Sequence, residues 1–184
     1  MRIISGYLKG KKILLPKDKL TRPLKDMVKE SIFNIIEHSN EYKININNSI
    51  ILDLFSGSGS FGLECISRGA DKVTFNENYE SAIEILEKNI KILNCENKCQ
   101  ILKTNCFDLF KYFSQKVNLI FMDPPFKEDK LNELIELIYK MKILDQKGLI
   151  LIHREKKNQE IFSKKLKIID ERYYGLSKII FAKF

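Results

Sequence analysis

Hydrophobic positions change their period near residue 50 of the chain. Before that point, apolar residues recur every three or four positions and predict one amphipathic helix over 21–39, with Pro23 in its first turn. The apolar positions of this helix are Leu24, Met27, Val28, Ile32, Ile35 and Ile36. After that point, short runs such as 49–55 and 117–123 are apolar almost throughout, as expected of strands buried on both faces of a parallel sheet.

These runs alternate with segments of helical period, which predicts an α/β fold. We expect strands at 49–55, 72–77, 99–105, 117–123 and 147–153, and helices at 57–69, 80–93, 107–113, 131–141 and a lysine-rich 155–165. Residues 166–184 predict two more strands with no room for a helix between them, so these must pair as an antiparallel hairpin. Residues 2–5 and 11–16 predict a small hairpin before the first helix. We therefore expect an extension over 1–45 and a core over 46–184.

A glycine-rich loop follows the first core strand and opens the next helix. Gly57, Gly59 and Gly62 have the spacing G-x-G-x-x-G, which lets the backbone turn sharply and lets a ligand approach closely. Asp53 lies just before this loop, and Glu77 ends the next strand, where a carboxylate can accept hydrogen bonds from ribose hydroxyls. The charge of Asp53 disfavours a diphosphate and favours S-adenosylmethionine, which carries a sulfonium and an ammonium group. The alternative interpretation is a tight turn that binds no ligand.

The sequence Asp123-Pro124-Pro125-Phe126 ends the fourth core strand. In a sheet of this kind that strand ends beside the first, at the switch in strand order where ligands bind. The Asp123 carboxylate and the Pro124 carbonyl can accept both hydrogens of a nucleobase amine, and the prolines fix the direction of that carbonyl. Phe126 can stack on a base that has left its partner strand. The alternative interpretation is an ordinary turn with a packed phenylalanine.

The formal net charge of +8 indicates a polyanionic partner. The predicted RNA-binding residues all lie in the extension and are Arg2, Lys11, Lys12, Arg22, Lys25 and Lys29. A solvated basic appendage is the alternative, because lysine is common along the whole chain. The cysteines lack the paired spacing of a zinc site, so we expect no metal. No run has the length of a membrane span or the character of a signal peptide, so the cytoplasm is the expected location.

Several segments resemble the bacterial 16S ribosomal RNA guanine-N2 methyltransferases, the small-subunit methyltransferase D family. They are "RIISGYLKGKKILLP", "TRPLKDMVKESIFNII", "LDLFSGSGSFGLE", "FMDPPF" and "YYGLSKIIFAKF". The resemblance implies a Rossmann-like class I methyltransferase fold, with a mostly parallel seven-stranded sheet, a C-terminal antiparallel hairpin and an N-terminal hairpin and helix. It also implies methyl transfer from S-adenosylmethionine to a guanine N2 amine of 16S rRNA, in the 30S subunit or its assembly intermediate.

With this resemblance, the predicted site has two parts. The predicted cofactor-binding residues are Asp53, Phe55, Gly57, Ser58, Gly59, Gly62, Glu77, Asn105 and Cys106. The predicted amine-binding residues are Asp123, Pro124, Pro125 and Phe126.

The chain departs from this family at several positions. Lys25, Met27 and Lys29 interrupt the family pattern Arg-Pro-Thr-x-Asp-Arg-Val-Arg-Glu, which removes the bidentate contacts that arginine makes. Tyr79 stands where an acidic or polar residue is common after the ribose-binding glutamate. His153 stands near a position where the family often has glutamate, and we interpret it as a strand-end residue rather than a catalyst.

Other functions share parts of this pattern. DNA adenine-N6 or cytosine-N4 methyltransferases use the same amine chemistry, but the chain is short for the separate target-recognition domain that they usually carry. Release factor glutamine methyltransferases typically have asparagine where Asp123 stands. A non-catalytic RNA-binding assembly factor on the same fold is a further alternative, although the complete glycine loop and Asp-Pro-Pro-Phe sequence argue against it. Nothing indicates an obligate dimer, so we expect a monomer.

Overall fold

The computed structural model describes residues 1–17, 24–39, 42, 44–158 and 160–184. Its elements are α1 (Asp26–His38), β1 (Ile50–Leu54), α2 (Ser60–Ser67), β2 (Lys72–Asn76), α3 (Glu80–Ile92), β3 (Cys99–Leu102), β4 (Val117–Met122), α4 (Leu131–Met141), β5 (Leu144–Glu155), β6 (Lys167–Tyr174) and β7 (Ser177–Lys183). The helix expected at 107–113 is only a short 3-10 helix, Leu109–Lys111. Pro23 lies outside the described residues, and α1 begins at Asp26. None of the helices in the described ranges is both long and apolar enough to cross a membrane.

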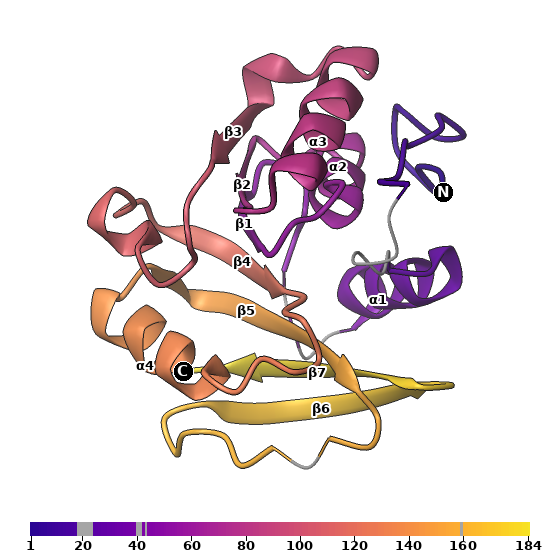
Figure 1. Ribbon diagram of the computed structural model, residues 1–184. Coiled ribbons are helices and arrows are strands. Elements are labelled where there is room, and N and C mark those ends of the chain that lie inside the picture. The colour runs from indigo at the N-terminus through magenta and orange to yellow at the C-terminus, as the bar shows by residue number, and fades with distance from the viewer. Residues whose placement is uncertain (18–23, 40–41, 43, 159) are drawn as a thin grey trace.

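The sheet has seven strands in the order β3-β2-β1-β4-β5-β7-β6 (Figure 1). β1 pairs in parallel with β2 on one side and with β4 on the other, so the strand order switches between these two neighbours. β5 continues the parallel part, whereas β7 pairs antiparallel with both β5 and β6. The predicted fold class, including the antiparallel hairpin at the C-terminal end, is confirmed.

Alternating side chains of the strands enter two apolar layers, one on each face of the sheet. Ile51 of β1 packs in the layer that contains residues of α1, α2 and α3, whereas Leu52 and Leu54 pack in the layer that contains α4. Figure 1 shows the same division of the helices between the two faces. Each fully buried isoleucine or leucine contributes about 1.5–3 kcal/mol, so burial in both layers stabilises the sheet that carries the site.

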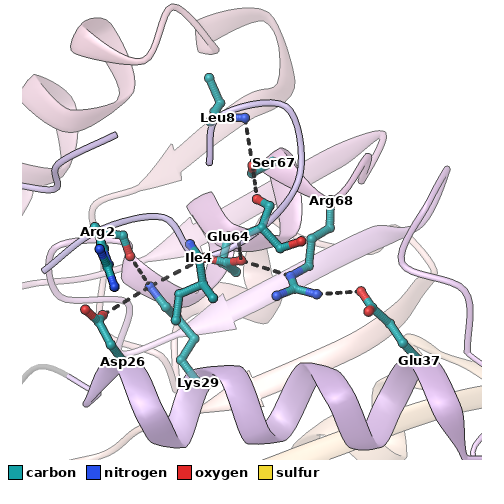
Figure 2. A network of polar contacts seen from close by, with 10 residues as sticks. Arg2, Ile4, Leu8, Asp26, Lys29, Glu37, Glu64, Ser67 and Arg68 are labelled. Atoms are coloured by element: carbon teal, nitrogen blue, oxygen red, sulfur yellow. Dashed lines mark hydrogen bonds and ion pairs between the residues drawn. The ribbon is translucent and has the colours of Figure 1, made fainter. Parts of the chain in front are cut away.

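Glu64 and Ser67 of α2 hold the N-terminal extension on the core (Figure 2). Glu64 is fully buried and accepts hydrogen bonds from the backbone N–H groups of Ile4 at 2.8 Å and Ser5 at 2.9 Å. Its Oε1 also accepts from Nε of Arg68 at 2.9 Å. These are charge-assisted hydrogen bonds, which are stronger than neutral ones. Glu64 therefore fixes the first residues of the chain on the core.

Lys29 is not an exposed cation, which corrects its predicted role in RNA binding. Its side chain is fully buried, and Nζ lies 3.5 Å from Oε2 of Glu64 and donates to the carbonyl of Arg2 at 2.9 Å (Figure 2). Burial lowers the pKa of Lys29, and the nearby Glu64 carboxylate opposes that shift. A phosphate cannot reach this charge without unfolding the segment around it. Only Lys25, directly before α1, keeps the exposed position that we expected of both lysines.

The expected N-terminal hairpin is smaller than predicted. One antiparallel bridge joins Arg2 and Lys12, and the N–H of Gly10 donates to the carbonyl of Ile3 at 2.9 Å. Gly6 has a φ of +81°, and a Cβ at this residue would lie 1.7 Å from the carbonyl oxygen of Ser67. Only glycine allows this close approach to α2.

The prediction of a helix over 155–165 is wrong. β5 continues to Glu155 and a turn follows at 156–157. The N–H of Lys156 donates to the carbonyl of Leu176 at 2.7 Å, and Nζ of Lys178 donates to the carbonyl of Asn158 at 3.1 Å. These bonds hold the segment against β7 and the turn before it, and they outweigh a helix propensity worth only tenths of a kcal/mol per residue, about 0–0.7.

Candidate functional site

A cavity of about 920 Å³ opens at the carboxyl ends of β1, β2 and β4. This is the edge where the strand order switches, which is where open α/β sheets bind their ligands. The predicted site residues that line it are Asp53, Phe55, Gly57, Ser58, Glu77, Asn105, Cys106, Asp123, Pro124, Pro125 and Phe126. The structure therefore brings the predicted amine-binding residues and all predicted cofactor-binding residues except Gly59 and Gly62 together in one cavity.

Gly59 and Gly62 lie behind the wall of this cavity, where they let α2 pack against its neighbours. A Cβ on Gly62 would lie 2.3 Å from the ring of Phe75 on β2. A Cβ on Gly59 would lie 2.3 Å from the side chain of Leu86 on α3. Both glycines thus serve packing, which is one of the roles that glycines have in such loops, rather than direct ligand contact.

Gly57 and Glu77 connect the glycine loop to the end of β2. The N–H of Gly57 donates to Oε2 of Glu77 at 2.7 Å, and the N–H groups of Asn78 and Tyr79 donate to Oε1 at 2.9 and 3.0 Å. Each carboxylate oxygen has two lone pairs, so Glu77 can still accept a hydrogen bond from a ligand in the cavity. A Cβ at Gly57 would meet nothing within 4 Å, which leaves room for a ligand to approach the backbone.

Asp53 is the most buried charge of the cavity. Its Oδ2 accepts the N–H of Gly62 at 3.0 Å, whereas its buried Oδ1 has no hydrogen-bond partner among the described residues. Burial raises the pKa of Asp53 well above its usual value, against the hydrogen bond from Gly62, and the carboxylates of Asp123 and Glu77 raise it further. The site is therefore one in which an added cation would be stabilised.

These features fit S-adenosylmethionine. The unpaired Oδ1 of Asp53 suits an ammonium or sulfonium group, and the open space at Gly57 allows close contact with the backbone. Glu77 lies at the end of β2, where a carboxylate can bind a ribose. Phe55 and Phe107 add apolar surface to the same cavity. A dinucleotide fits less well because its diphosphate would meet several carboxylates.

Asn105 and Cys106 follow β3 and form part of the cavity wall. Oδ1 of Asn105 accepts the N–H of Phe107 at 2.9 Å, which fixes the turn. Burial raises the pKa of Cys106 to about 12, so its thiol stays protonated and is not a nucleophile. In the part of the chain that the structure describes, no group of three or more His, Cys, Asp and Glu side chains is arranged to hold a metal ion.

His153 is a site residue that the sequence interpretation missed. Its Nδ1 lies 2.8 Å from Oδ1 of Asp123, its Nε2 lies 2.9 Å from Oγ of Ser177, and its ring meets that of Phe126 edge-on at 5.7 Å. We expected it at the end of the strand, but β5 continues to Glu155, and His153 contacts the predicted catalytic carboxylate from within the strand. The signal was the register, because both Asp123 and His153 directly follow buried apolar runs of neighbouring parallel strands.

The predicted RNA-binding residues differ in their exposure, and an antiparallel bridge places Arg2 beside Lys12. Arg2, Lys11, Lys12 and Lys25 are exposed, whereas Lys29 is buried. Arg22 lies outside the described residues. The exposed cations belong to the extension, whose Leu15 and Pro16 line the cavity, whereas none of these cations lines it among the described residues.

Comparison with known proteins identifies the family. A family described as Conserved hypothetical protein 95 matches residues 1–183. Ribosomal RNA small subunit methyltransferase D of Buchnera aphidicola subsp. Acyrthosiphon pisum is 37% identical over 163 residues, which cover 88% of this chain and 82% of that protein. The protein of the same name from Haemophilus influenzae is 31% identical over 179 residues, which cover 96% of this chain and 90% of that protein. The chain belongs to this methyltransferase D family.

The solved structures agree with this assignment. The Escherichia coli protein yhhF superposes with a TM-score of 0.84 at 27% identity, covering 99% of this chain and 96% of that one. This chain therefore has the class I methyltransferase fold. Its methyl donor is S-adenosylmethionine. The predicted family and fold are confirmed.

Proposed function

We propose that this chain transfers a methyl group from S-adenosylmethionine to the exocyclic N2 amine of a guanine in 16S ribosomal RNA of the small subunit. One observation carries the proposal: Asp53, whose buried Oδ1 has no partner among the described residues, lines the same cavity as Asp123 and Pro124. The names of the methyltransferase D relatives support ribosomal RNA of the small subunit as the substrate.

The residues on the amine side of the cavity activate the nucleobase amine for methyl transfer. A nucleobase amine is a weak nucleophile because its lone pair is delocalised into the ring. The carboxylate of Asp123 and the carbonyl of Pro124 accept its two hydrogens, which favours a pyramidal nitrogen whose lone pair points away from both acceptors. When bound, S-adenosylmethionine supplies a methyl group to that lone pair and keeps the electron pair of the broken sulfur–carbon bond on sulfur. Asp123 or water then takes the proton that the nitrogen releases.

The remaining residues bind and orient the two ligands. Asp53 and Glu77 hold the cationic and ribose parts of the donor, and Phe126 stacks on the guanine. Holding both reactants in line supplies a large part of the rate. Arg2, Lys11, Lys12 and Lys25 contact RNA phosphates and orient the substrate without reading its sequence. We place Arg22 in the same role from its sequence position. A monomer in the cytoplasm, where ribosomal subunits are assembled, is sufficient for this reaction.

The decisive experiment measures transfer of tritiated methyl groups from S-adenosylmethionine to 30S subunits, free 16S RNA and DNA, followed by nucleoside analysis. We expect N2-methylguanosine from the subunits or the RNA and no label in DNA. Label in DNA as N6-methyladenine or N4-methylcytosine would overturn the RNA assignment. Absence of binding heat with S-adenosylmethionine in calorimetry would overturn catalysis altogether and leave the fold as an RNA-binding module.

A further inference from the structure

Two consecutive residues at the end of β5 contact the Asp-Pro-Pro-Phe loop, and neither has a role in the function proposed above. His153 and Arg154 are both buried, with 6% and 2% of their surface exposed. Successive side chains of a strand leave it on opposite faces, so two neighbours can contact different parts of the same loop. His153 contacts the side chain of Asp123, and Arg154 contacts the backbone that follows it.

Arg154 occupies the carbonyl groups of the second half of the loop. Its Nη1 donates to the carbonyl of Pro125 at 3.0 Å, and its Nη2 donates to those of Phe126 at 3.3 Å and Glu128 at 3.2 Å. Asn158 also donates to the carbonyl of Phe126, at 3.2 Å. An ion pair with Glu160 holds Nε of the same guanidinium. A planar five-donor group is the one side chain that can serve several carbonyls in this way.

The carbonyl of Pro124, in contrast, has no hydrogen-bond donor among the described residues, although the residue is buried and lines the cavity. Buried carbonyls are almost always paired, so an unpaired one at a cavity wall is suited to a donor on the ligand. Among the described residues, the carbonyl of Pro124 is therefore unpaired, next to those of Pro125 and Phe126, which Arg154 and Asn158 occupy.

His153 likewise bonds one of the two carboxylate oxygens of Asp123 and leaves the other without a donor. Two lone pairs cannot face each other at 2.8 Å, so the proton between them lies on Nδ1 and His153 donates to Oδ1 of Asp123. The contact of Nε2 with Ser177 on β7 fixes the plane of the ring. No donor among the described residues reaches Oδ2, and the Asp123 side chain is 20% exposed and lines the cavity.

We propose that His153 and Arg154 are positioning residues of the amine site, which leave Oδ2 of Asp123 and the carbonyl of Pro124 as its two acceptors. This inference rests on the proposed function, since it assigns the atoms that receive the amine. Neither residue touches the substrate. Each acts by occupying the competing acceptors and by preventing the loop from rotating, because small errors in the position of reacting groups are costly.

The test compares variants of the full chain in methyl transfer to 30S subunits. Arg154→Met removes the donors and keeps an apolar side chain, and we expect kcat to fall about 10- to 100-fold, the cost of a displacement near 1 Å. Arg154→Lys keeps the positive charge but lacks the planar guanidinium with its several N–H donors, so we expect its kcat to lie between those of Arg154→Met and the wild type. Donor affinity, measured by calorimetry, should stay within about threefold of the wild type, because the donor pocket is formed by other residues. Arg172→Met is the matched control, since Arg172 is exposed and pairs with Asp170 on β6.

His153 allows a rescue experiment. In His153→Asn an amide N–H can take the place of Nδ1–H, whereas His153→Ala leaves Oδ1 of Asp123 without this donor. We expect the alanine variant to lose about 10-fold or more in kcat and the asparagine variant to recover most of it, with thermal melting checked for both. This pair decides the question if Arg154→Met is too unstable to assay.

The outcomes separate the two proposals. Wild-type protein that binds S-adenosylmethionine but methylates no RNA overturns the proposed function. Wild-type transfer, together with unchanged kcat in folded Arg154→Lys and His153→Ala, overturns the positioning roles and leaves the function standing. A loss that appears in donor affinity, with kcat unchanged, also overturns them, since it would place these residues in the donor pocket.

Discussion

The donor side and the amine side of the cavity are built in different ways. On the donor side, the contacts join residues close in sequence: Asp53 with Gly62 nine positions on, and Gly57 with Glu77 twenty positions on. On the amine side, Asp123 is held by His153, thirty positions on, and Pro125 by Arg154, twenty-nine positions on. These two donor-side contacts are made by loops and backbone amides within one βαβ unit, whereas the amine side requires β5 to lie beside β4. Damage to the two sides should therefore have separable effects on binding and on chemistry.

The largest expected effect is that of Asp123→Ala on methyl transfer. Loss of one amine acceptor and proton acceptor should lower kcat by about 10³-fold, within the range measured for such groups. Donor affinity should stay close to that of the wild type, because the donor contacts come from β1 and β2. Single-turnover transfer and calorimetry on the same preparation measure both quantities. A parallel loss of donor affinity would show that the two sides are not separable.

Asp53→Asn should lower donor affinity, the quantity that Asp123→Ala is expected to leave unchanged. We expect donor affinity to fall about 10- to 100-fold, as for a lost charged hydrogen bond of about 1.5–3 kcal/mol. The ligand-free protein should at the same time become more stable at neutral pH, because burial raises the pKa of Asp53. An acid with a raised pKa stabilises the fold most below its ordinary pKa, and this contribution is lost as pH rises through the folded value.

Melting curves as a function of pH check this sign. The difference between Asp53→Asn and the wild type should shrink as the pH falls toward the ordinary pKa of an aspartate, about 3.9. Asp71→Asn is the control, because Asp71 is exposed and its replacement should leave the pH dependence unchanged. A variant that is less stable than the wild type at neutral pH would contradict the assignment of Asp53 as an uncompensated buried acid.

The glycine loop gives a third comparison, within the donor side. Gly62→Ala should destabilise the protein by about 1–3 kcal/mol in urea unfolding, because a Cβ there meets the ring of Phe75 at 2.3 Å. Gly57→Ala places its Cβ in open space, so it should cost only the strain of its positive φ, about 1 kcal/mol, while it obstructs the donor. Equal stability losses in the two variants would show that Gly62 is not a packing residue.

The smallest effect belongs to the basic extension. The double change Lys11→Glu with Lys12→Glu should weaken binding to 30S subunits and lower the slope of log K against log salt by about 0.7 for each phosphate that these lysines neutralise in the wild type. It should leave donor affinity and stability unchanged, since both side chains are exposed. Unchanged binding at every salt concentration would remove these residues from the substrate surface.

The contrast between contacts close in sequence and contacts far apart in sequence also explains what could be predicted from the sequence. The apolar runs and the G-x-G-x-x-G loop are local patterns, and they correctly predicted the sheet, the switch between β1 and β4 and the lining residues Asp53 and Gly57. His153 was interpreted as a strand-end residue only, because its importance comes from the register of β5 on β4. Lys29 was placed on the exposed face by helical spacing, because a buried partner on α2 leaves no trace in the pattern of α1.

The lysine-rich segment shows the same limit. Its composition predicts a helix, but Asn158 and Lys156 bond to Phe126 and Leu176, which lie 32 and 20 positions away. Local propensity could not reveal those partners. The residues that shape the amine site were therefore the hardest to find, although the reactive carboxylate itself was easy.

Glu64 has a consequence for any attempt to shorten this protein at its beginning. Deleting residues 1–14 would take away two of the amide groups that solvate a fully buried anion and the carbonyl that binds Lys29. Glu64 would keep its contacts with Lys29 and Arg68, but it would lose these amide donors about one turn into the helix that follows the glycine loop. Truncated forms should therefore be less stable than the full chain, because a buried charge that loses its hydrogen-bond donors carries a large desolvation cost.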